Sequence, residues 1–271
     1  MNKLSIISID AGKSYITYYM LKSLMTLNLK DVEVIILCNT DNDYLHLLDK
    51  FKDRVKFIYN FDLVKSYDKP HLKHMYSFQY LLQQVNSEYI FFCDNDVIFT
   101  EKFKDYLNIY QNYDIIAEVE DYENRIKYFI KDIYMYDNNI KIYDENKTNI
   151  YINNEYYRNL KLVETDNTLY KFNCGKNIDV ELYNRFLPYH IFFNTEKIKS
   201  IPLFDIDYEI GYCVDKRKLY DSFSTITYNA IKNNFNIHYT SFADSVIHVR
   251  SSTWYRDYES YINRLKELNL L

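Results

Sequence analysis

The chain has 271 residues, 48% of them hydrophobic, and a formal net charge of −5. This length and apolar content suit one large domain, or a domain with a sizeable insertion. The negative charge and the lack of a large basic patch argue against a tight nucleic-acid binder. No stretch approaches the ~20 apolar residues that span a bilayer. The start of the chain lacks a secretory signal pattern. The four cysteines form no CxxC pair, so we expect a cytoplasmic protein with reduced thiols.

Glycine and proline are scarce, with three of each in the chain. The turns between elements must therefore use other residues. Asn and Asp tolerate the left-handed backbone conformation better than other non-glycine residues. We expect these two residue types to make most of the turns.

Strand patterns alternate with helical patterns over roughly the first 100 residues. Apolar runs predict strands over 3–9, 32–38, 55–59 and 88–93. Apolar residues at helical spacing predict helices over 14–28 and 71–85, and a shorter one carrying Leu45, Leu48 and Phe51. This alternation predicts an α/β fold with a mainly parallel, doubly wound, Rossmann-like sheet. The continuous apolar strands are typical of strands covered on both faces.

Two carboxylates one residue apart, Asp94 and Asp96, follow the fourth of these strands. A carboxylate pair at the end of a buried strand is costly unless something positive lies beside it. Mg²⁺ and Mn²⁺ are natural candidates because they take oxygen ligands and bridge phosphates. The alternative is a simple polar turn, since Asn and Asp favour turns. Ligands of open α/β sheets bind beyond the carboxyl ends of the strands, where the polar residues 39–43 are also expected to lie.

Residues 1 to about 100 resemble the nucleotide-sugar half of a GT-A glycosyltransferase, with EYIFFCDNDVIF as the strand that carries the DxD motif. The resemblance implies that Asp94 and Asp96 hold Mn²⁺ or Mg²⁺, which would bridge the two phosphates of a nucleotide-diphospho-sugar. A UDP-sugar is the favoured donor.

Two later segments resemble further parts of the same pattern. Residues 188–195 resemble a strand that ends in an Asn-Thr pair, and residues 247–254 resemble a segment in which a His completes the metal shell. The resemblance thus implies His248 as a third metal ligand. It does not extend to residues 118–180.

Donor-binding and catalytic side chains are predicted around the strand ends. The predicted donor-binding set is Asn39, Thr40, Asp41, His71, Lys73 and Asn95. His74 is expected to be solvated or packed. An inverting transfer needs a carboxylate that deprotonates the acceptor hydroxyl, and we rank Asp221 first and Asp207 second. Asp221 can also cap the helix that it opens, and a retaining enzyme needs no such base.

Residues 118–180 contain short strand patterns separated by turn-rich groups, which predicts a β-hairpin-rich insertion. It would separate a nucleotide-sugar-binding region, 1–117, from an acceptor-side region, 181–271, that completes the same catalytic domain. The insertion is expected to be an acceptor platform, a surface for homo-oligomer formation, or a structural element whose aromatic side chains pack on the main sheet.

Three functions stay open from the sequence. The first is a metal-dependent glycosyltransferase acting on a hydroxyl of a glycan, a protein, a lipid-linked acceptor or a modified nucleic acid. The second is a nucleotidyltransferase, a class whose members resemble one another in a Gly- and Arg-rich amino-terminal loop that binds the triphosphate. Residues 8–15 hold one Gly and no Arg. The third is a catalytically inactive protein that binds a nucleotide sugar or a partner.

Overall fold

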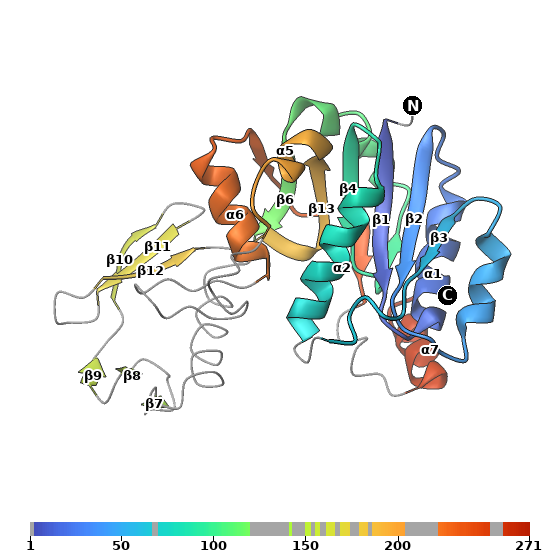
Figure 1. Cartoon of the computed structure of the whole chain (residues 1–271), viewed down its shortest axis with the longest axis horizontal. Helices are drawn as coiled ribbons and strands as arrows, with labels where there is room; N and C mark the ends of the chain where they lie inside the picture. The colour runs from blue at the N-terminus through green and yellow to red at the C-terminus, as the bar shows by residue number, and fades with distance from the viewer. Residues whose placement is uncertain are drawn as a thin grey trace. The chain divides into compact units, whose positions relative to one another are not determined.

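The computed structural model describes residues 3–66, 70–119, 141–142, 150–152, 155–157, 161–165, 169–173, 179–183, 186–203, 222–249 and 257–271. The chain forms two compact units. Unit 1 comprises Met1–Glu118, Pro188–Ser200 and Phe235–Leu271, and unit 2 comprises Val119–Leu187 and Ile201–Asn234. The predicted α/β class is confirmed, because a mixed and mostly parallel sheet of seven strands forms the body of unit 1 (Figure 1).

The strands of this sheet lie in the order β14-β6-β13-β4-β1-β2-β3. Their bounds are β1 (Leu4–Asp10), β2 (Val32–Cys38), β3 (Lys56–Tyr59), β4 (Tyr89–Cys93), β6 (Ile115–Val119), β13 (Phe186–Asn194) and β14 (Ile237–Tyr239). The pairs β4–β1, β1–β2 and β2–β3 are parallel, whereas β13 runs antiparallel to β4. The carboxyl ends of β4, β1 and β2 therefore meet at one edge, where a doubly wound sheet binds its ligand.

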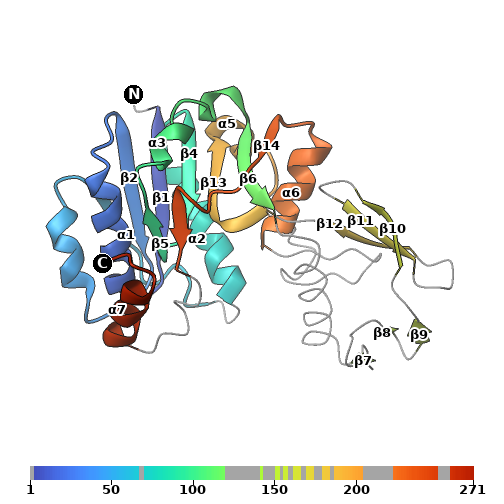
Figure 2. The same cartoon turned by 180° about the vertical axis from the view of Figure 1, so that it is seen from behind.

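Helices cover both faces of the sheet (Figures 1 and 2). Their bounds in unit 1 are α1 (Ser14–Thr26), η1 (Leu45–Phe51), α2 (Pro70–Gln84), α3 (Phe103–Tyr106), η2 (Tyr110–Asn112), α5 (Thr195–Lys199) and α7 (Tyr258–Glu267). Successive residues of β4 point to opposite faces of the sheet, toward α2 on one side and α3 on the other. The Phe92 ring lies 4.7 Å from Phe78 of α2, and the Phe91 ring lies 4.9 Å from Phe103 of α3. The short predicted helix at Leu45–Phe51 is a 3₁₀ helix.

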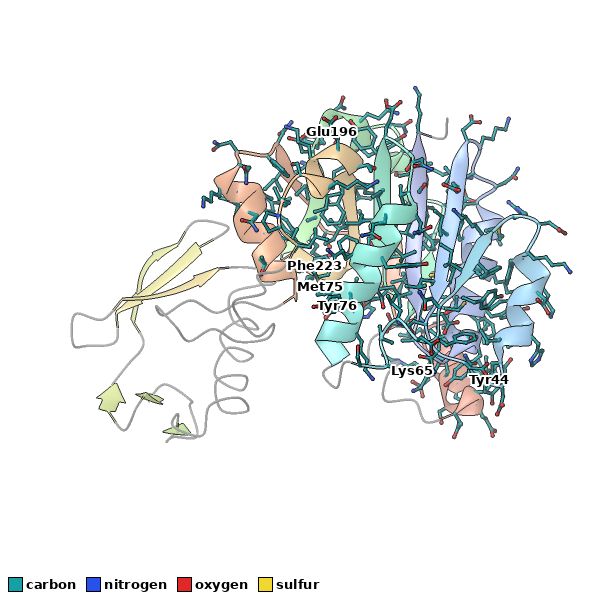
Figure 3. All side chains as sticks on the ribbon, viewed as in Figure 1. Tyr44, Lys65, Met75, Tyr76, Glu196 and Phe223 are labelled. Carbon is teal, nitrogen blue, oxygen red and sulfur yellow. The ribbon has the colours of Figure 1, made fainter. Side chains whose placement is uncertain are left out.

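The core of unit 1 fills the space between the sheet and these helices. Figure 3 draws the side chains and labels Met75 on α2, which is fully buried together with Phe78 and Leu81 of the same helix. The other face is aromatic, with Phe91, Phe103 and Phe192 in contact at centroid distances of 4.5–5.8 Å. Each such buried ring contributes roughly 1.5–3 kcal/mol by leaving water.

Asn and Asp take the left-handed backbone conformation, as the scarcity of glycine predicts. Among the described residues, positive φ angles occur at Asn28 (49°), Asp31 (58°), Asn234 (53°) and Asn269 (55°), and at Gly12 (105°). Asn28 and Asn269 follow the ends of α1 and α7, where a left-handed residue satisfies the last helical carbonyls.

A two-stranded ribbon outside the main sheet joins distant parts of unit 1. Strand β5 (Val97–Phe99) pairs antiparallel with β15 (Val246–His248), so that Val97 lies opposite His248. The Val249 N–H then donates to the Asp96 carbonyl at 2.8 Å. This pairing brings residue 248 beside the strand-end aspartates.

Unit 2 contains the predicted hairpins. Strands β10 (Lys161–Thr165), β11 (Leu169–Asn173) and β12 (Asp179–Tyr183) form an antiparallel meander, as do β7 (Lys141–Ile142), β8 (Ile150–Ile152) and β9 (Glu155–Tyr157). The unit also holds α6 (Ser222–Lys232). No helix in the described part of the chain is long and apolar enough to cross a membrane. Cys38 and Cys93 are buried free thiols, whereas Cys174 and Cys213 lie outside the described residues.

Candidate metal centre

The two aspartates lie at the carboxyl end of β4, where backbone hydrogen bonds fix the chain on both sides. The Asp94 N–H donates to the Tyr189 carbonyl of β13 at 3.0 Å, and the Asp96 carbonyl accepts from Val249. The Asp94 side chain is 28% exposed and that of Asp96 is 10% exposed. One carboxylate therefore faces partly toward solvent while the other is largely buried.

His248 completes a compact cluster with these aspartates. One ligand atom from each of Asp94, Asp96 and His248 lies within 4.8 Å of the others. His248 Nε2 is 3.1 Å from Asp96 Oδ1. Ligands on opposite sides of one Mg²⁺-sized ion lie about 4 Å apart, because each bond is about 2.1 Å long. The structure thus brings together the three residues predicted as metal ligands, at a spacing that fits one ion.

A second histidine lies on the α2 side of the cluster. His74 Nε2 is 3.3 Å from Asp94 Oδ1, and its ring centroid lies 5.5 Å from that of Phe92. Among the described residues, the cluster whose ligand atoms all lie within 4.8 Å of one another does not include His74. His74 therefore lies where it can orient Asp94 rather than share its ion. The sequence indicated only a solvated or packed histidine here, because its partner lies 20 residues away in another element.

Tyr189 packs directly on the third predicted ligand. Its ring is stacked on the His248 imidazole with a centroid distance of 3.9 Å and an interplanar angle of 19°. Its carbonyl accepts the Asp94 N–H. Tyr189 therefore contacts two members of the cluster, Asp94 through its carbonyl and His248 through its ring. Sequence analysis did not assign this role to it.

Polar residues from β1 and β2 occupy the neighbouring strand ends. The Asn39 N–H donates to the Asp10 carbonyl at 3.2 Å. The Asn39 amide is buried and donates from Nδ2 to Ser77 of α2 at 2.9 Å. Thr40 and Asp41, also predicted to bind the donor, are exposed. Asn39 thus supports the strand end, whereas Thr40 and Asp41 are accessible to a ligand.

Asp10 is a buried carboxylate that sequence analysis did not single out. Its Oδ1 accepts the Gly12 N–H at 3.0 Å, and the residue is 0% exposed. Burial raises the pKa of the Asp10 carboxyl, and hydrogen bonds from Ser14 and Gly12 oppose that shift. Gly12 has φ of +105°, and a Cβ there would lie 3.0 Å from the Thr40 methyl carbon. This turn needs glycine to pack against Thr40. The signal was an acidic residue ending an apolar strand.

The remaining predicted site residues are only partly described. Asn95 donates from Nδ2 to Thr17 Oγ1 of α1 at 2.9 Å, which ties the aspartate loop to the helix. Lys73 is half-buried on α2. The side chain of His71 and the proposed bases Asp207 and Asp221 lie outside the described residues.

His190, the next residue of β13, has a structural partner. It is 3% exposed, and its Nε2 lies 3.0 Å from Glu118 Oε2. The same carboxylate oxygen accepts the Phe242 N–H at 3.2 Å. This pair links β13, β6 and the segment before β15, and it satisfies one ring nitrogen of His190, whereas the buried Nδ1 has no hydrogen-bond partner among the described residues.

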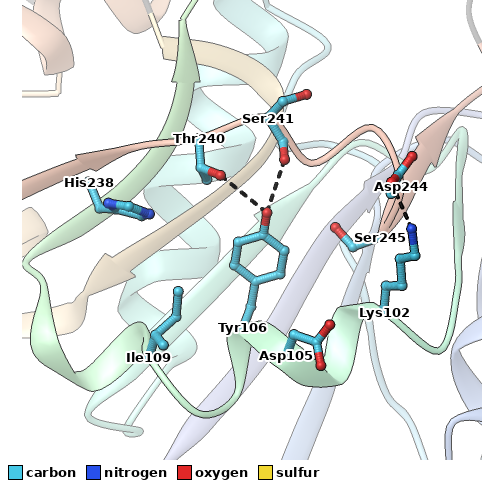
Figure 4. A pocket seen from close by; sticks show the side chains of 9 residues that line it. All are labelled: Lys102, Asp105, Tyr106, Ile109, His238, Thr240, Ser241, Asp244 and Ser245. Atoms are coloured by element: carbon cyan, nitrogen blue, oxygen red, sulfur yellow. Dashed lines mark hydrogen bonds and ion pairs between the residues drawn. The ribbon is translucent and has the colours of Figure 1, made fainter.

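A separate hollow of about 400 Å³ lies between α3 and the segment that precedes β15 (Figure 4). Its polar groups are largely paired with one another. Tyr106 Oη donates to the Ser241 carbonyl at 3.0 Å and lies 3.3 Å from Thr240 Oγ1, and Lys102 bonds Asp244 at 2.7 Å. None of its lining residues belongs to the aspartate–histidine cluster.

Comparison with known proteins finds likeness in structure but not in sequence. No family model matches the chain, and no curated protein matches it. Solved glycosyltransferases are among the structures that resemble this chain. The parallel strands β4, β1 and β2 and the aspartates at the end of β4 agree with the GT-A resemblance of the sequence.

Three solved structures illustrate the likeness. The mannosyltransferase PcManGT from Pyrobaculum calidifontis, in complex with GDP-Man and Mn²⁺, is 11% identical, with 97% of this chain and 60% of that chain covered and a TM-score of 0.49. TarS 1-349 of S. aureus with UDP-GlcNAc is 14% identical, with 98% and 65% covered and a TM-score of 0.46. The galactosyltransferase LgtC with donor and acceptor sugar analogs is 12% identical, with 88% and 73% covered and a TM-score of 0.47.

The chain spans 36% to 65% of the length of the first four solved chains that it matches. At these identities the likeness concerns the fold alone. The activity, substrates and metal of this chain are therefore proposed below from its own side chains.

Proposed function

We propose that this protein is a metal-dependent glycosyltransferase. It would move a sugar from a nucleotide-diphospho-sugar, a UDP-sugar first among them, to an acceptor hydroxyl. The observation that carries the proposal is the cluster of Asp94, Asp96 and His248 at the carboxyl end of β4. That edge is where an open α/β sheet binds nucleotides, and two adjacent carboxylates there need a cation or a proton to offset their repulsion.

The donor atoms suit Mn²⁺ or Mg²⁺. Carboxylate oxygens are the preferred ligands of these ions, and an imidazole nitrogen is a good ligand for transition metals. Three protein ligands leave positions open for oxygens of a substrate. When bound, such an ion acts as a Lewis acid that stabilises a diphosphate leaving group.

The residues around the cluster would bind and orient the donor. Asp94, Asp96 and His248 would hold the metal, and Thr40 and Asp41, which are exposed at the end of β2, would face the nucleotide. These positions are consistent with a donor that lies across the ends of β4, β1 and β2.

The acceptor side of the proposal rests on sequence alone. We retain Asp221, followed by Asp207, as the base that removes the acceptor proton if the reaction inverts configuration. His71, Lys73 and Asn95 remain predicted donor contacts.

A screen of nucleotide sugars by thermal unfolding, each with Mn²⁺ and with EDTA, tests the proposal. The true donor at 100 times its Kd stabilises the protein by about 2.7 kcal/mol, and this gain should require Mn²⁺. Release of UDP or GDP in the presence of acceptors then measures turnover. Asp94→Asn should lose both responses, whereas Asp244→Asn, an exposed aspartate outside the cluster, should keep them.

Other outcomes identify the alternatives. Pyrophosphate release from a nucleoside triphosphate and a sugar phosphate would indicate a nucleotidyltransferase. Donor binding without hydrolysis or transfer to any acceptor would indicate an inactive binding protein. Equal Mn²⁺-dependent binding of UDP-sugars by the wild type and by Asp94→Asn would refute the metal role of the cluster.

A further inference from the structure

We propose that Tyr189 is a positioning residue that fixes the plane of the His248 imidazole and thereby sets the metal affinity of the cluster. This inference rests on the proposed function, because it requires His248 to bind a metal. Tyr189 itself would touch neither the metal nor the substrate. Its role would be carried by its ring, which is stacked on His248 at 3.9 Å.

His248 needs such an orienting contact. Rotation about the χ2 angle of histidine is broad, so the rotamer alone does not fix the ring plane. A metal-bound histidine usually donates its second ring nitrogen to a carboxylate or carbonyl, which fixes the ring. Among the described residues, the buried Nδ1 of His248 has no hydrogen-bond partner. The usual orienting bond is therefore replaced here by a stacked aromatic ring.

The stack holds His248 in the direction that metal binding requires. With an interplanar angle of 19°, the tyrosine ring blocks rotation of the imidazole out of its plane. In this orientation Nε2 lies 3.1 Å from Asp96 Oδ1 and points into the cluster. Aromatic pairs of this kind favour one arrangement by about 2- to 12-fold beyond the effect of their buried area.

The position of Tyr189 follows from the strand register. His190 lies opposite Cys93 in the antiparallel pair of β13 and β4. Tyr189 therefore lies opposite Asp94, and its carbonyl accepts the Asp94 N–H at 3.0 Å. The backbone of Tyr189 fixes one ligand while its ring fixes another. A side-chain substitution removes the contact with His248 and leaves the backbone hydrogen bond to Asp94, which separates the two roles.

Unit 1 offers a matched control for general packing effects. Tyr113 is stacked on His238 at 4.7 Å with an interplanar angle of 20°, away from the cluster. Tyr113→Leu removes a half-buried tyrosine from a histidine, as Tyr189→Leu does. It should leave metal binding unchanged.

The experiment measures Mn²⁺ affinity of the full chain without donor, by calorimetry and by the EPR signal of free Mn²⁺. We expect Tyr189→Leu to weaken Mn²⁺ binding by about 3- to 10-fold, the effect of losing one aromatic pair that orients the imidazole. Tyr189→Phe keeps the stacked ring and should bind Mn²⁺ with the affinity of the wild type. Thermal unfolding in EDTA shows whether each variant is folded. Tyr189→Met, whose flexible unbranched side chain adapts better to an irregular space, replaces the leucine variant if the latter does not fold.

NMR of histidine-labelled wild-type protein provides a test without any variant. The His248 ring protons should be shifted upfield by the ring current of Tyr189. Wild-type Mn²⁺ affinity in a folded Tyr189→Leu or Tyr189→Met variant, or unshifted His248 protons, would overturn the inference while the metal site stands. No Mn²⁺ binding by the wild type would instead overturn the proposed function.

Discussion

Replacing Asp96 by Asn should make the metal-free protein more stable while removing its response to metal. The ligand atoms of Asp94 and Asp96 lie within 4.8 Å of each other. At an effective dielectric constant of about 20, two unit charges at that distance repel by about 3.5 kcal/mol. His248 and His74 beside the pair and the 28% exposure of Asp94 offset part of this repulsion. We therefore expect Asp96→Asn to raise the free energy of unfolding without metal by about 1–3 kcal/mol, which is less than the full repulsion.

Urea unfolding in EDTA and in saturating Mn²⁺ measures both effects. The wild type should gain about 2.7 kcal/mol at an Mn²⁺ concentration of 100 times its Kd. Asp96→Asn should gain little or nothing, because the cluster loses a charged ligand. Asp244→Asn serves as the matched control, since Asp244 is exposed and bonds Lys102 instead. The reasoning is wrong if Asp96→Asn is less stable than the wild type in EDTA and still shows the wild-type gain with Mn²⁺.

Substitutions at three further positions test other parts of unit 1. Asn28→Ala should cost about 1–2 kcal/mol in urea unfolding because residue 28 has φ of 49°, whereas Asn28→Gly should be close to neutral; equal losses would contradict this. Burial raises the pKa of Asp10 above its usual 3.8, so its contribution to stability is present below pH 3.8 and is lost as the pH rises through the folded pKa. Asp10→Asn should therefore gain stability relative to the wild type between pH 4 and pH 7 in urea unfolding, and a constant difference would exclude the effect. His74→Ala should weaken Mn²⁺ binding by about tenfold and His74→Gln by less, and calorimetry showing wild-type affinity for both would leave His74 as a packing residue.

The fold of unit 1 could be predicted because its signals are local. Continuous apolar runs such as that of β4 indicate buried parallel strands, and the abrupt change to Asp94 and Asp96 marks the strand end. The use of Asn and Asp in left-handed turns also followed from composition, since a chain with three glycines has few other residues for them. The position of Asn28 did not, because the helix was predicted to include residue 28 and ends at Thr26. These patterns depend only on residues that are close together in the chain, so they can be recognised in a single sequence.

The supporting residues of the site could not be found in the same way. Tyr189 and His248 meet because β13 pairs with β4 in one register and β15 pairs with β5 in another. His74 reaches Asp94 from α2, the helix that precedes β4 in the chain. No short pattern marks such contacts, and one tyrosine among 31 carries no signal of its own. The resemblance supplied His248, whereas its orienting partner required the structure.

The β5–β15 ribbon also sets the order of events during synthesis. It pairs Val97 with His248, which closes a loop of about 150 residues at an entropic cost of about 4 kcal/mol. Long-range pairings of this kind form late, and chains fold as they emerge from the ribosome, amino-terminal parts first. A nascent chain that ends before residue 248 would present two carboxylates without the imidazole. The cluster of three side chains would therefore arise only after β15 has been synthesised and docked, later than the strands β1 to β4.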